Sequence, residues 1–284
     1  MTSRSEQEPG PRTRAVFVSA LKLLSATGVP FLVGGAYAFE RHTGIARHTR
    51  DLDVFIREQD FPALTEHFES GGYRAEVPFP HWLGKVYKGR TYVDLIFSSG
   101  NGMARVDDEW FAHAAAGEVL GVPVQLCAVE EMIWSKAFIM ERERFDGADV
   151  LHLLHERASV LDWHRLLGRF ADHSPVLFAH LVLFGYVYPG ERGRIPMWVW
   201  NQLLGETSRD DARRNGERIC RGTLLSRSQY LIDLERGYTD ARLADGVMSR
   251  DDLATWTEAA ATEDRTGVPG ERVIEHAREL REES

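Results

Sequence analysis

Cysteine and lysine are scarce in this chain of 284 residues. The two cysteines, Cys127 and Cys220, stand far apart and form no C-x-x-C motif, which excludes a disulfide framework, a zinc ribbon and a cysteine-bound iron–sulfur cluster. Two free thiols are typical of a reducing compartment, so we expect a cytoplasmic protein. Only four lysines, at positions 22, 85, 88 and 136, accompany thirty arginines. Each ammonium group is therefore a position of interest in an arginine-rich sequence.

Apolar runs long enough to cross a membrane are also missing. The N-terminal residues MTSRSEQEPGPRTR lack the apolar core of a secretory signal. The longest apolar run, VLFAHLVLFGYVY at residues 176–188, contains a histidine and is shorter than the about 20 residues of a membrane-spanning helix. We therefore predict a buried helix in a soluble protein, and no membrane partner.

The chain carries an excess of acidic residues. Asp and Glu number 43 against 34 Lys and Arg, which gives a formal net charge of −9. This balance excludes a uniformly basic surface for nucleic acid, although it does not exclude a local basic patch.

The hydrophobic pattern divides the chain into a mixed part and a helical part. After a tail at 1–12 that we expect to be disordered, residues 13–127 combine helical periodicity with short strand-like runs bounded by glycine. From residue 128 to 284 strand signals nearly vanish and helix-length stretches follow one another. We expect an α+β fold, in which a mixed sheet with flanking helices precedes an all-helical C-terminal domain. Strands are predicted at 31–33, 51–56, 73–77, 82–87, 91–98, 118–120 and 122–126, and the predicted helices include 61–70 and 130–142.

Two carboxylates share one face of the strand predicted at 51–56. A buried run at 31–33 ends in Gly34 and Gly35, and the later strand begins with Asp51 and Asp53. Residues i and i+2 of a strand point to the same face, about 6.5–7 Å apart along the chain, so both carboxylates can bind one hard cation or two neighbouring ones. Magnesium prefers such oxygen ligands and completes its shell with water and substrate phosphate. Glycines let the backbone approach a triphosphate, and the amides that open the next helix favour anions.

A third carboxylate, Asp94, interrupts the apolar strand predicted at 91–98. Burying an unpaired carboxylate costs several kcal/mol, so Asp94 must face a group that compensates its charge. A metal shared with Asp51 and Asp53 is the simplest candidate. In that arrangement two cations would hold the attacking and leaving oxygens of an in-line displacement, and Asp94 would accept the proton of the attacking hydroxyl.

This order of motifs, two glycines, then D-x-D on a strand, then a lone aspartate on a later strand, resembles the nucleotidyltransferase superfamily related to DNA polymerase β. The resemblance covers about residues 30–155. It implies a nucleotidyltransferase-type sheet in which Gly34 and Gly35 hold the triphosphate. It further implies that Asp51 and Asp53 bind Mg²⁺ or Mn²⁺, and that Asp94 is the third carboxylate.

A helical motif narrows the resemblance. The segment with Lys136, Asp146 and Asp149 is similar to the AbiEii-type branch, which includes stand-alone bacterial proteins and the toxins of type IV toxin–antitoxin systems. The resemblance implies that Lys136 contacts phosphate, and that Asp149, or else Asp146, orients this lysine or touches the nucleotide. The usual G-S or G-G-T is here Gly-Gly-Ala. No hydroxyl follows the glycines, so Thr49 or Arg50 would contact the phosphate instead.

The implied reaction is the magnesium-dependent transfer of a nucleoside monophosphate from an NTP to a hydroxyl acceptor, with release of pyrophosphate. The acceptor stays open at this point: an RNA, such as a tRNA end, with an antitoxin as a possible partner, or a small molecule, such as an antibiotic or a metabolite. A third alternative is a catalytically silent nucleotide-binding module. The missing hydroxyl after Gly35 favours the silent module, whereas the intact set of carboxylates disfavours it.

Overall fold

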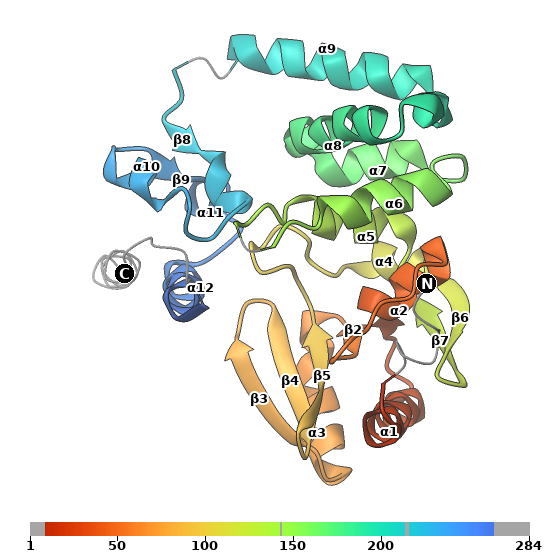
Figure 1. Ribbon diagram of the computed structural model, residues 1–284. Helices are drawn as coiled ribbons and strands as arrows, with labels where there is room; N and C mark the ends of the chain where they lie inside the picture. Colours follow the sequence, from red (N-terminus) through yellow and green to blue (C-terminus); the bar gives the residue numbers. More distant parts are fainter. Residues whose placement is uncertain (1–8, 143, 214–215, 264–284) are drawn as a thin grey trace. The chain divides into compact units, whose positions relative to one another are not determined.

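The structure of the chain is a computed structural model that describes residues 9–142, 144–213 and 216–263 (Figure 1). The chain divides into two compact units. The first comprises Met1–Gly100 with Ala104–Val129, and the second comprises Asn101–Met103 with Glu130–Ser284.

A seven-stranded mixed sheet in the order β3-β4-β5-β2-β1-β7-β6 forms the centre of the first unit. Strand β1 pairs antiparallel with β2 and parallel with β7, and β2 pairs parallel with β5. The two outer hairpins, β3-β4-β5 and β6-β7, are antiparallel. The strands are β1 (Leu32–Val33), β2 (Asp53–Phe55), β3 (Arg74–Phe79), β4 (Leu83–Lys88), β5 (Thr91–Ile96), β6 (Ala115–Val119) and β7 (Val122–Leu126).

The strands form where the sequence pattern predicts them, but their bounds differ: β1, β2 and β5 are shorter than predicted, β3 and β4 are displaced by one or two residues, β6 begins three residues earlier, and β7 has the predicted bounds. Leu52, Val54 and Ile56 are fully buried, which confirms the alternation predicted for 51–56, although only Asp53–Phe55 has strand geometry. A tight turn at Gly89, whose φ is 64°, joins β4 to β5, because glycine adopts this left-handed conformation without steric cost.

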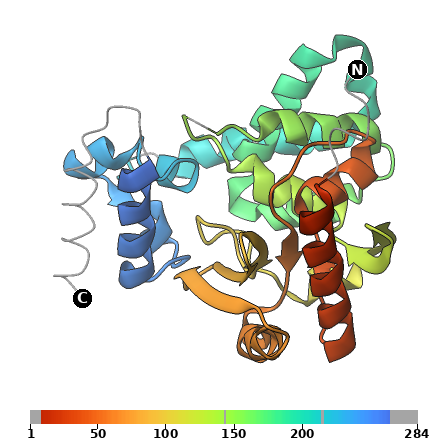
Figure 2. The ribbon, with the colours of Figure 1, turned by 60° about the horizontal axis from the view of Figure 1, so that its bottom comes forward.

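The helices of the first unit are α1 (Pro11–Thr27), α2 (Gly35–Thr43), α3 (Phe61–Ser70) and α4 (Asp108–Ala112), and a 3-10 turn occurs at Glu58–Asp60. Helices α1 and α3 lie side by side against strands β3, β4 and β5 (Figures 1 and 2). Their apolar residues Phe17, Leu21, Leu64 and Phe68 form part of the buried core. The other face of these strands is therefore free of α1 and α3.

Helix α1 begins inside the segment that the sequence assigns to an N-terminal tail. Residues 1–8 of the expected tail at 1–12 lie outside the described residues, whereas residues 11 and 12 already belong to α1. Pro11 explains the early start, since proline is favoured at the first helical position, where its missing N–H has no helical partner to lose.

The second unit is predominantly helical, and two short strands, β8 (Ile219–Cys220) and β9 (Thr239–Asp240), form one parallel pair within it. This pair departs from the all-helical expectation. The helices are α5 (Val129–Ala137), α6 (Gly147–Arg157), α7 (Trp163–Phe170), α8 (Ser174–Val187), α9 (Met197–Arg213), α10 (Leu231–Glu235), α11 (Ala241–Ala244) and α12 (Arg250–Glu263), and 3-10 turns occur at Ala171–His173, Pro189–Arg194 and Arg221–Leu224.

Helix α8 contains most of the apolar run that the sequence places at 176–188. Leu177, Leu181 and Phe184 are fully buried, whereas Val182 and Tyr186 are exposed, so the predicted helix is present but only half of it is buried. The run Trp163–Val187 has the length and hydropathy of a membrane span, with one third of its most apolar window buried. Core helices of soluble proteins meet the same criterion, and cytoplasmic location stays a prediction.

A buried ion pair organises the end of the second unit. The guanidinium of Arg242, which is fully buried, donates to the Asp240 carboxylate at 2.6 Å from Nη2 and 3.0 Å from Nε. The same carboxylate caps helix α11 by accepting from the Arg242 amide. Burial alone would raise the pKa of Asp240, but the hydrogen bonds and charge of Arg242 outweigh it and hold the pKa below its ordinary value.

Replacing this carboxylate will therefore destabilise the protein. Asp240→Asn leaves the buried guanidinium without its counter-charge, and we expect the free energy of unfolding at neutral pH to fall by about 3 kcal/mol or more. Because the pKa of Asp240 is lowered on folding, this contribution is present above the ordinary pKa of about 4 and is lost as the pH falls through the lowered value. Urea denaturation of both proteins at a series of pH values measures it, and the two curves should converge in acid.

Asp233→Asn is the matched control. Its partner Arg236 is exposed and 3.4 Å away, so the loss should stay below about 1 kcal/mol. Equal losses for the two variants at neutral pH would contradict the structural role of the buried pair.

Candidate active site

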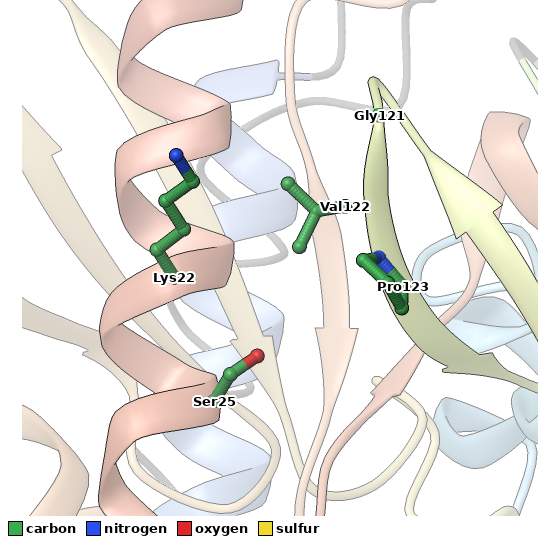
Figure 3. Close-up of a pocket in the computed structure, with 5 residues that line it drawn as sticks. All are labelled: Lys22, Ser25, Gly121, Val122 and Pro123. Carbon is green, nitrogen blue, oxygen red and sulfur yellow. The ribbon is translucent and has the colours of Figure 1, made fainter.

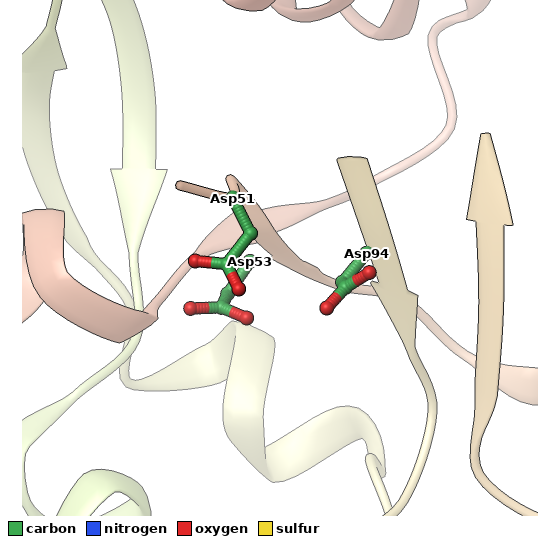
Figure 4. A group of neighbouring side chains, drawn as sticks. All are labelled: Asp51, Asp53 and Asp94. Atoms are coloured by element: carbon green, nitrogen blue, oxygen red, sulfur yellow. The ribbon is translucent and has the colours of Figure 1, made fainter. Parts of the chain in front are cut away.

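Three carboxylates meet at the centre of the sheet of the first unit. The parallel pairing of β2 with β5 sets Asp53 directly opposite Asp94, and Asp51 precedes Asp53 by two residues. One oxygen of each carboxylate lies within 4.8 Å of the other two. In Figure 4 the Asp51 and Asp53 side chains lie close together, and Asp94 faces them from the neighbouring strand. The tertiary structure thus brings together the three acidic residues that the sequence predicts as a group.

The two glycines at the end of β1 are required by the packing of Asp53. Gly35 has a φ of 52°, and a Cβ atom there would lie 1.7 Å from Oδ2 of Asp53. A Cβ atom on Gly34 would lie 2.3 Å from the ring of Phe55, and the Gly34 amide donates to the Asp53 carbonyl at 3.0 Å. Only glycine allows α2 to start this close to the carboxylate.

Thr49 and Arg50, the predicted substitutes for the missing hydroxyl, lie just before the acidic strand. The Thr49 hydroxyl is 2.6 Å from Oδ1 of Asp51 and 3.1 Å from the Asp51 carbonyl. As a single donor facing a carboxylate, it orients Asp51 in this structure. The side chain of Arg50 is exposed. Their contact with a phosphate stays a prediction.

Lys85 completes the surroundings of the carboxylates, and the sequence interpretation did not assign it a role. It lies opposite Asp94 on β4, and its Nζ donates to Oδ1 of Asp94 at 2.6 Å. The same Nζ lies 4.3 Å from the centroid of the Tyr92 ring. The sequence contains a signal for this contact, because a two-residue turn at 89–90 between antiparallel strands sets residue 85 opposite residue 94.

The charge state of Asp94 reflects opposing influences. Burial raises its pKa above the ordinary value, the hydrogen bond and charge of Lys85 lower it, and the charge of Asp51 raises it again. The pKa of Tyr92 is likewise raised, first by burial and then by the charges of Asp51 and Asp94, among others. The negative charges at this point of the sheet therefore raise the pKa values of neighbouring groups.

The carboxylates suit a hard divalent cation. Three carboxylate oxygens within 4.8 Å of one another supply the ligand type that Mg²⁺ and Mn²⁺ prefer. The Lys85 ammonium contacts Asp94, and like charges as close together as the three carboxylates repel. A bound cation would remove this repulsion, so the residues present fit the metal that the sequence resemblance implies.

A row of aromatic and charged side chains continues from the carboxylates on the same face of the sheet. Tyr87 lies opposite Tyr92, with ring centroids 5.6 Å apart. Arg74 of β3 lies over the Tyr87 ring at 4.8 Å and forms an ion pair with Glu76. Register partners in antiparallel strands share a face, so β3, β4 and β5 present this row beside the acidic residues.

Lys136, Asp146 and Asp149 belong to the second unit. The Nζ atom of Lys136 lies 2.7 Å from Oδ2 of Asp146 and 2.9 Å from Oδ2 of Asp149. Arg144 also donates to Asp146 at 3.0 Å. Burial raises the pKa of Asp146, but Arg144 and Lys136 together bring it below the ordinary value. Both aspartates named by the sequence motif therefore contact the lysine, and its role toward a nucleotide stays a prediction.

A separate hollow of about 370 Å³ lies between α1 and strand β7 (Figure 3). It is lined by Lys22, Ser25, Gly121, Val122 and Pro123. These residues include none of the three carboxylates and none of the aromatic row, so we assign this hollow no part in the chemistry.

Comparison with known proteins gives one match to a family. Residues 13–167, more than half of the chain, match the family described as "Nucleotidyl transferase of unknown function (DUF2204)". This match supports the nucleotidyltransferase superfamily, but it does not single out the AbiEii-type branch. No curated protein matches the chain significantly.

Solved structures give weaker similarities. The solution structure of the antibiotic-resistance factor ANT(2'')-Ia is 18% identical, covers 60% of this chain and 96% of its own, and has a TM-score of 0.43. The crystal structure of the lincosamide antibiotic adenylyltransferase LnuA with bound lincomycin is 16% identical, with coverages of 49% and 94% and a TM-score of 0.36. The crystal structure of ANT(2'')-Ia in complex with adenylyl-2''-tobramycin is 18% identical, covers 62% of this chain and 99% of its own, and has a TM-score of 0.36. Similarities of this size identify no substrate.

The close approach at Gly35 gives a direct test of the site. Gly35→Ala adds a methyl group to a residue with positive φ, where a non-glycine residue costs about 1–2 kcal/mol, and this methyl group also collides with Asp53. We expect a larger loss of unfolding free energy than from the φ angle alone, together with weaker binding of Mn²⁺. Urea denaturation and isothermal titration with MnCl₂ measure the two effects.

Gly44→Ala separates the two contributions. Gly44 ends the same helix with a φ of 72°, and nothing lies within 4 Å of its missing Cβ. This variant should therefore show the cost of the φ angle and keep the wild-type affinity for Mn²⁺. Identical behaviour of the two variants would show that Gly35 has no special relation to Asp53.

Proposed function

The chain belongs to the nucleotidyl transferase family DUF2204, and on this premise we propose that it transfers a nucleoside monophosphate from an NTP to a hydroxyl group of a small-molecule acceptor and releases pyrophosphate. The observation that carries the proposal is the group of Asp51, Asp53 and Asp94, whose oxygens lie within 4.8 Å of one another beside two glycines that hold the backbone close to them. A silent module would not need to maintain three repelling carboxylates on adjacent strands.

Each of the three carboxylates has a task in this reaction. Asp51, oriented by the hydroxyl of Thr49, and Asp53, packed against Gly35, would hold Mg²⁺ or Mn²⁺. Bound divalent cations would neutralise charge on the triphosphate and on the attacking oxygen, in the two-ion arrangement that three neighbouring carboxylates allow. Asp94 would accept the proton of the acceptor hydroxyl. The amides that open a helix favour an anion, so the start of α2 would suit the triphosphate.

The sheet face beside the carboxylates supports a small-molecule acceptor over RNA. Tyr87 and Tyr92 offer flat aromatic surface, on which ring-shaped acceptors pack. The two cations of this row are both paired, Arg74 with Glu76 and Lys85 with Asp94. RNA binding gains most of its affinity from cations that contact phosphates, and the net charge of −9 works against a polyanion. We therefore place the small molecule ahead of the RNA end.

The finer sequence resemblance adds two further proposals. In the AbiEii-type interpretation, Lys136 contacts the triphosphate and is oriented by Asp146 and Asp149, whose carboxylates it already contacts. The same interpretation includes an antitoxin partner and toxicity on expression. Growth arrest that Asp53→Asn relieves would support it.

Asp53→Asn tests the proposed reaction. Purified protein is incubated with each of the four α-labelled NTPs, Mg²⁺ and a host lysate separated into RNA, protein and small molecules. We expect label in the small-molecule fraction with the wild type, and a loss on the order of a thousandfold with the variant, because a cation loses a charged ligand at the reacting phosphate.

Asp108→Asn is the control, because it removes the same charge from an exposed side chain of the first unit. Label in the RNA fraction would identify RNA, and not a small molecule, as the acceptor. Binding of NTP without transfer to any fraction, or full activity of Asp53→Asn, would contradict the proposed chemistry.

Tyr87→Leu tests the acceptor surface. With the acceptor found in that assay, we expect KM for the acceptor to rise about tenfold, since stacking on an aromatic ring contributes on the order of 1 kcal/mol. KM for the NTP should change less, because the Tyr87–Tyr92 register pair lies two residues along the strands from the pair that contains Asp94. Steady-state kinetics in both substrates measure the split, and an unchanged KM for the acceptor would remove Tyr87 from its binding site.

A further inference from the structure

We propose that Lys85 is a built-in competitor of the divalent cation at Asp94: its ammonium group holds one oxygen of this carboxylate and lowers the affinity of the nucleotide-free protein for the metal ion. The inference rests on the proposed function, since it takes Asp51, Asp53 and Asp94 as the metal site.

Lys85 occupies an oxygen of Asp94 that a metal ion would also use. Lys85 Nζ lies 2.6 Å from Oδ1 of Asp94, which is the contact distance of a charge-assisted hydrogen bond. Magnesium ligated by the same oxygen would lie about 2.1 Å from it and hence within about 5 Å of the ammonium. Two cations at that separation repel strongly even in a polar surrounding. The metal must therefore either displace the ammonium or bind against its field.

The ammonium group of Lys85 is held in place at Asp94. Its side chain is 20% exposed, and its Nζ lies 4.3 Å from the centroid of the Tyr92 ring, so the ammonium is held from two sides. On the other side of β4, the register partner of Lys85 is Glu76 of β3, which already forms an ion pair with Arg74. An ammonium displaced from Asp94 therefore gives up its ion pair, and this loss opposes binding of the metal ion.

The Lys85 ammonium also changes the balance of charge at the three carboxylates. In the absence of metal it lies at hydrogen-bond distance from Asp94, the most deeply buried of the three. Lys85 therefore reduces the repulsion that drives cation binding. Replacing Lys85 by a neutral residue takes this positive charge away, and a cation then binds both more strongly and without displacing a competitor.

The test is the binding of Mn²⁺ alone to the nucleotide-free protein, measured by isothermal titration at constant pH and by the EPR signal of free Mn²⁺. We expect Lys85→Met to lower the Kd on the order of tenfold relative to the wild type. Lys85→Arg should restore the wild-type Kd, because it keeps the positive charge. An unchanged or higher Kd for Lys85→Met, with the fold intact by circular dichroism, would overturn the proposal.

Lys88→Met is the matched control. Lys88 lies on the same strand but three residues away, so it points to the opposite face, where its Nζ donates to the Gly71 carbonyl at 3.2 Å and lies over the Tyr73 ring. This variant loses the same charge and should keep the wild-type Kd. Equal tightening by Lys88→Met and Lys85→Met would show an effect of net charge and overturn the specific role of Lys85.

Binding of Mn²⁺ to Asp53→Asn distinguishes a failure of the competitor role of Lys85 from a failure of the proposed function. If the wild type binds Mn²⁺ and Asp53→Asn abolishes binding, the metal site holds, and an unchanged Lys85→Met refutes the competitor alone. If Mn²⁺ binds equally to the wild type and to Asp53→Asn, the carboxylates are not the metal site, and the proposed function fails together with the inference.

Discussion

Mutual repulsion of three carboxylates is the interaction around which the first unit is organised. Parallel pairing of β2 with β5 sets Asp53 opposite Asp94, and the D-x-D spacing adds Asp51 on the same face. Three neighbouring groups compensate for this crowding. Thr49 donates to Asp51, Gly35 leaves room for the Asp53 carboxylate, and Lys85 donates to Asp94. The positions of Thr49, Gly35 and Lys85 are thus all explained by the same group of carboxylates.

The second unit uses charge in a different way. Asp240 and Arg242 neutralise each other in a buried pair, and Glu131, also buried, forms ion pairs with Arg165 and Arg169. These pairs use arginine, whose planar guanidinium contacts carboxylates at two points. Where one ammonium lies between two aspartates, the residue is Lys136, and where it lies beside the proposed metal site it is Lys85. In a chain with four lysines and thirty arginines, two of the four lysines therefore hold carboxylates with a compact point charge.

Periodicity predicted the elements better than their ends. Helix α3 has the predicted bounds, because Pro62 near its start and two glycines after Ser70 leave little choice. Helix α5 ends at Ala137 although its apolar pattern continues to Met140. The exposed half of α8 was missed, since an uncharged helix carries no sequence mark of the face that is covered. The short strands β8 and β9 were missed because two residues are too few for any period.

The sequence by itself determined the identity of the acidic site: Gly-Gly, D-x-D and a lone aspartate on an apolar strand are local patterns, and each has a local physical reason. Only the tertiary structure decided how these carboxylates are balanced. The parallel pairing of distant strands places carboxylate oxygens of Asp51, Asp53 and Asp94 within 4.8 Å of one another. No pattern along the chain fixes which strands become neighbours. Lys85 depends on both the local sequence and the tertiary structure. The register of the β4–β5 hairpin, which the sequence predicts, sets Lys85 opposite Asp94. The pairing of β5 with β2, which only the tertiary structure shows, brings the charges of Asp51 and Asp53 to the other side of Asp94.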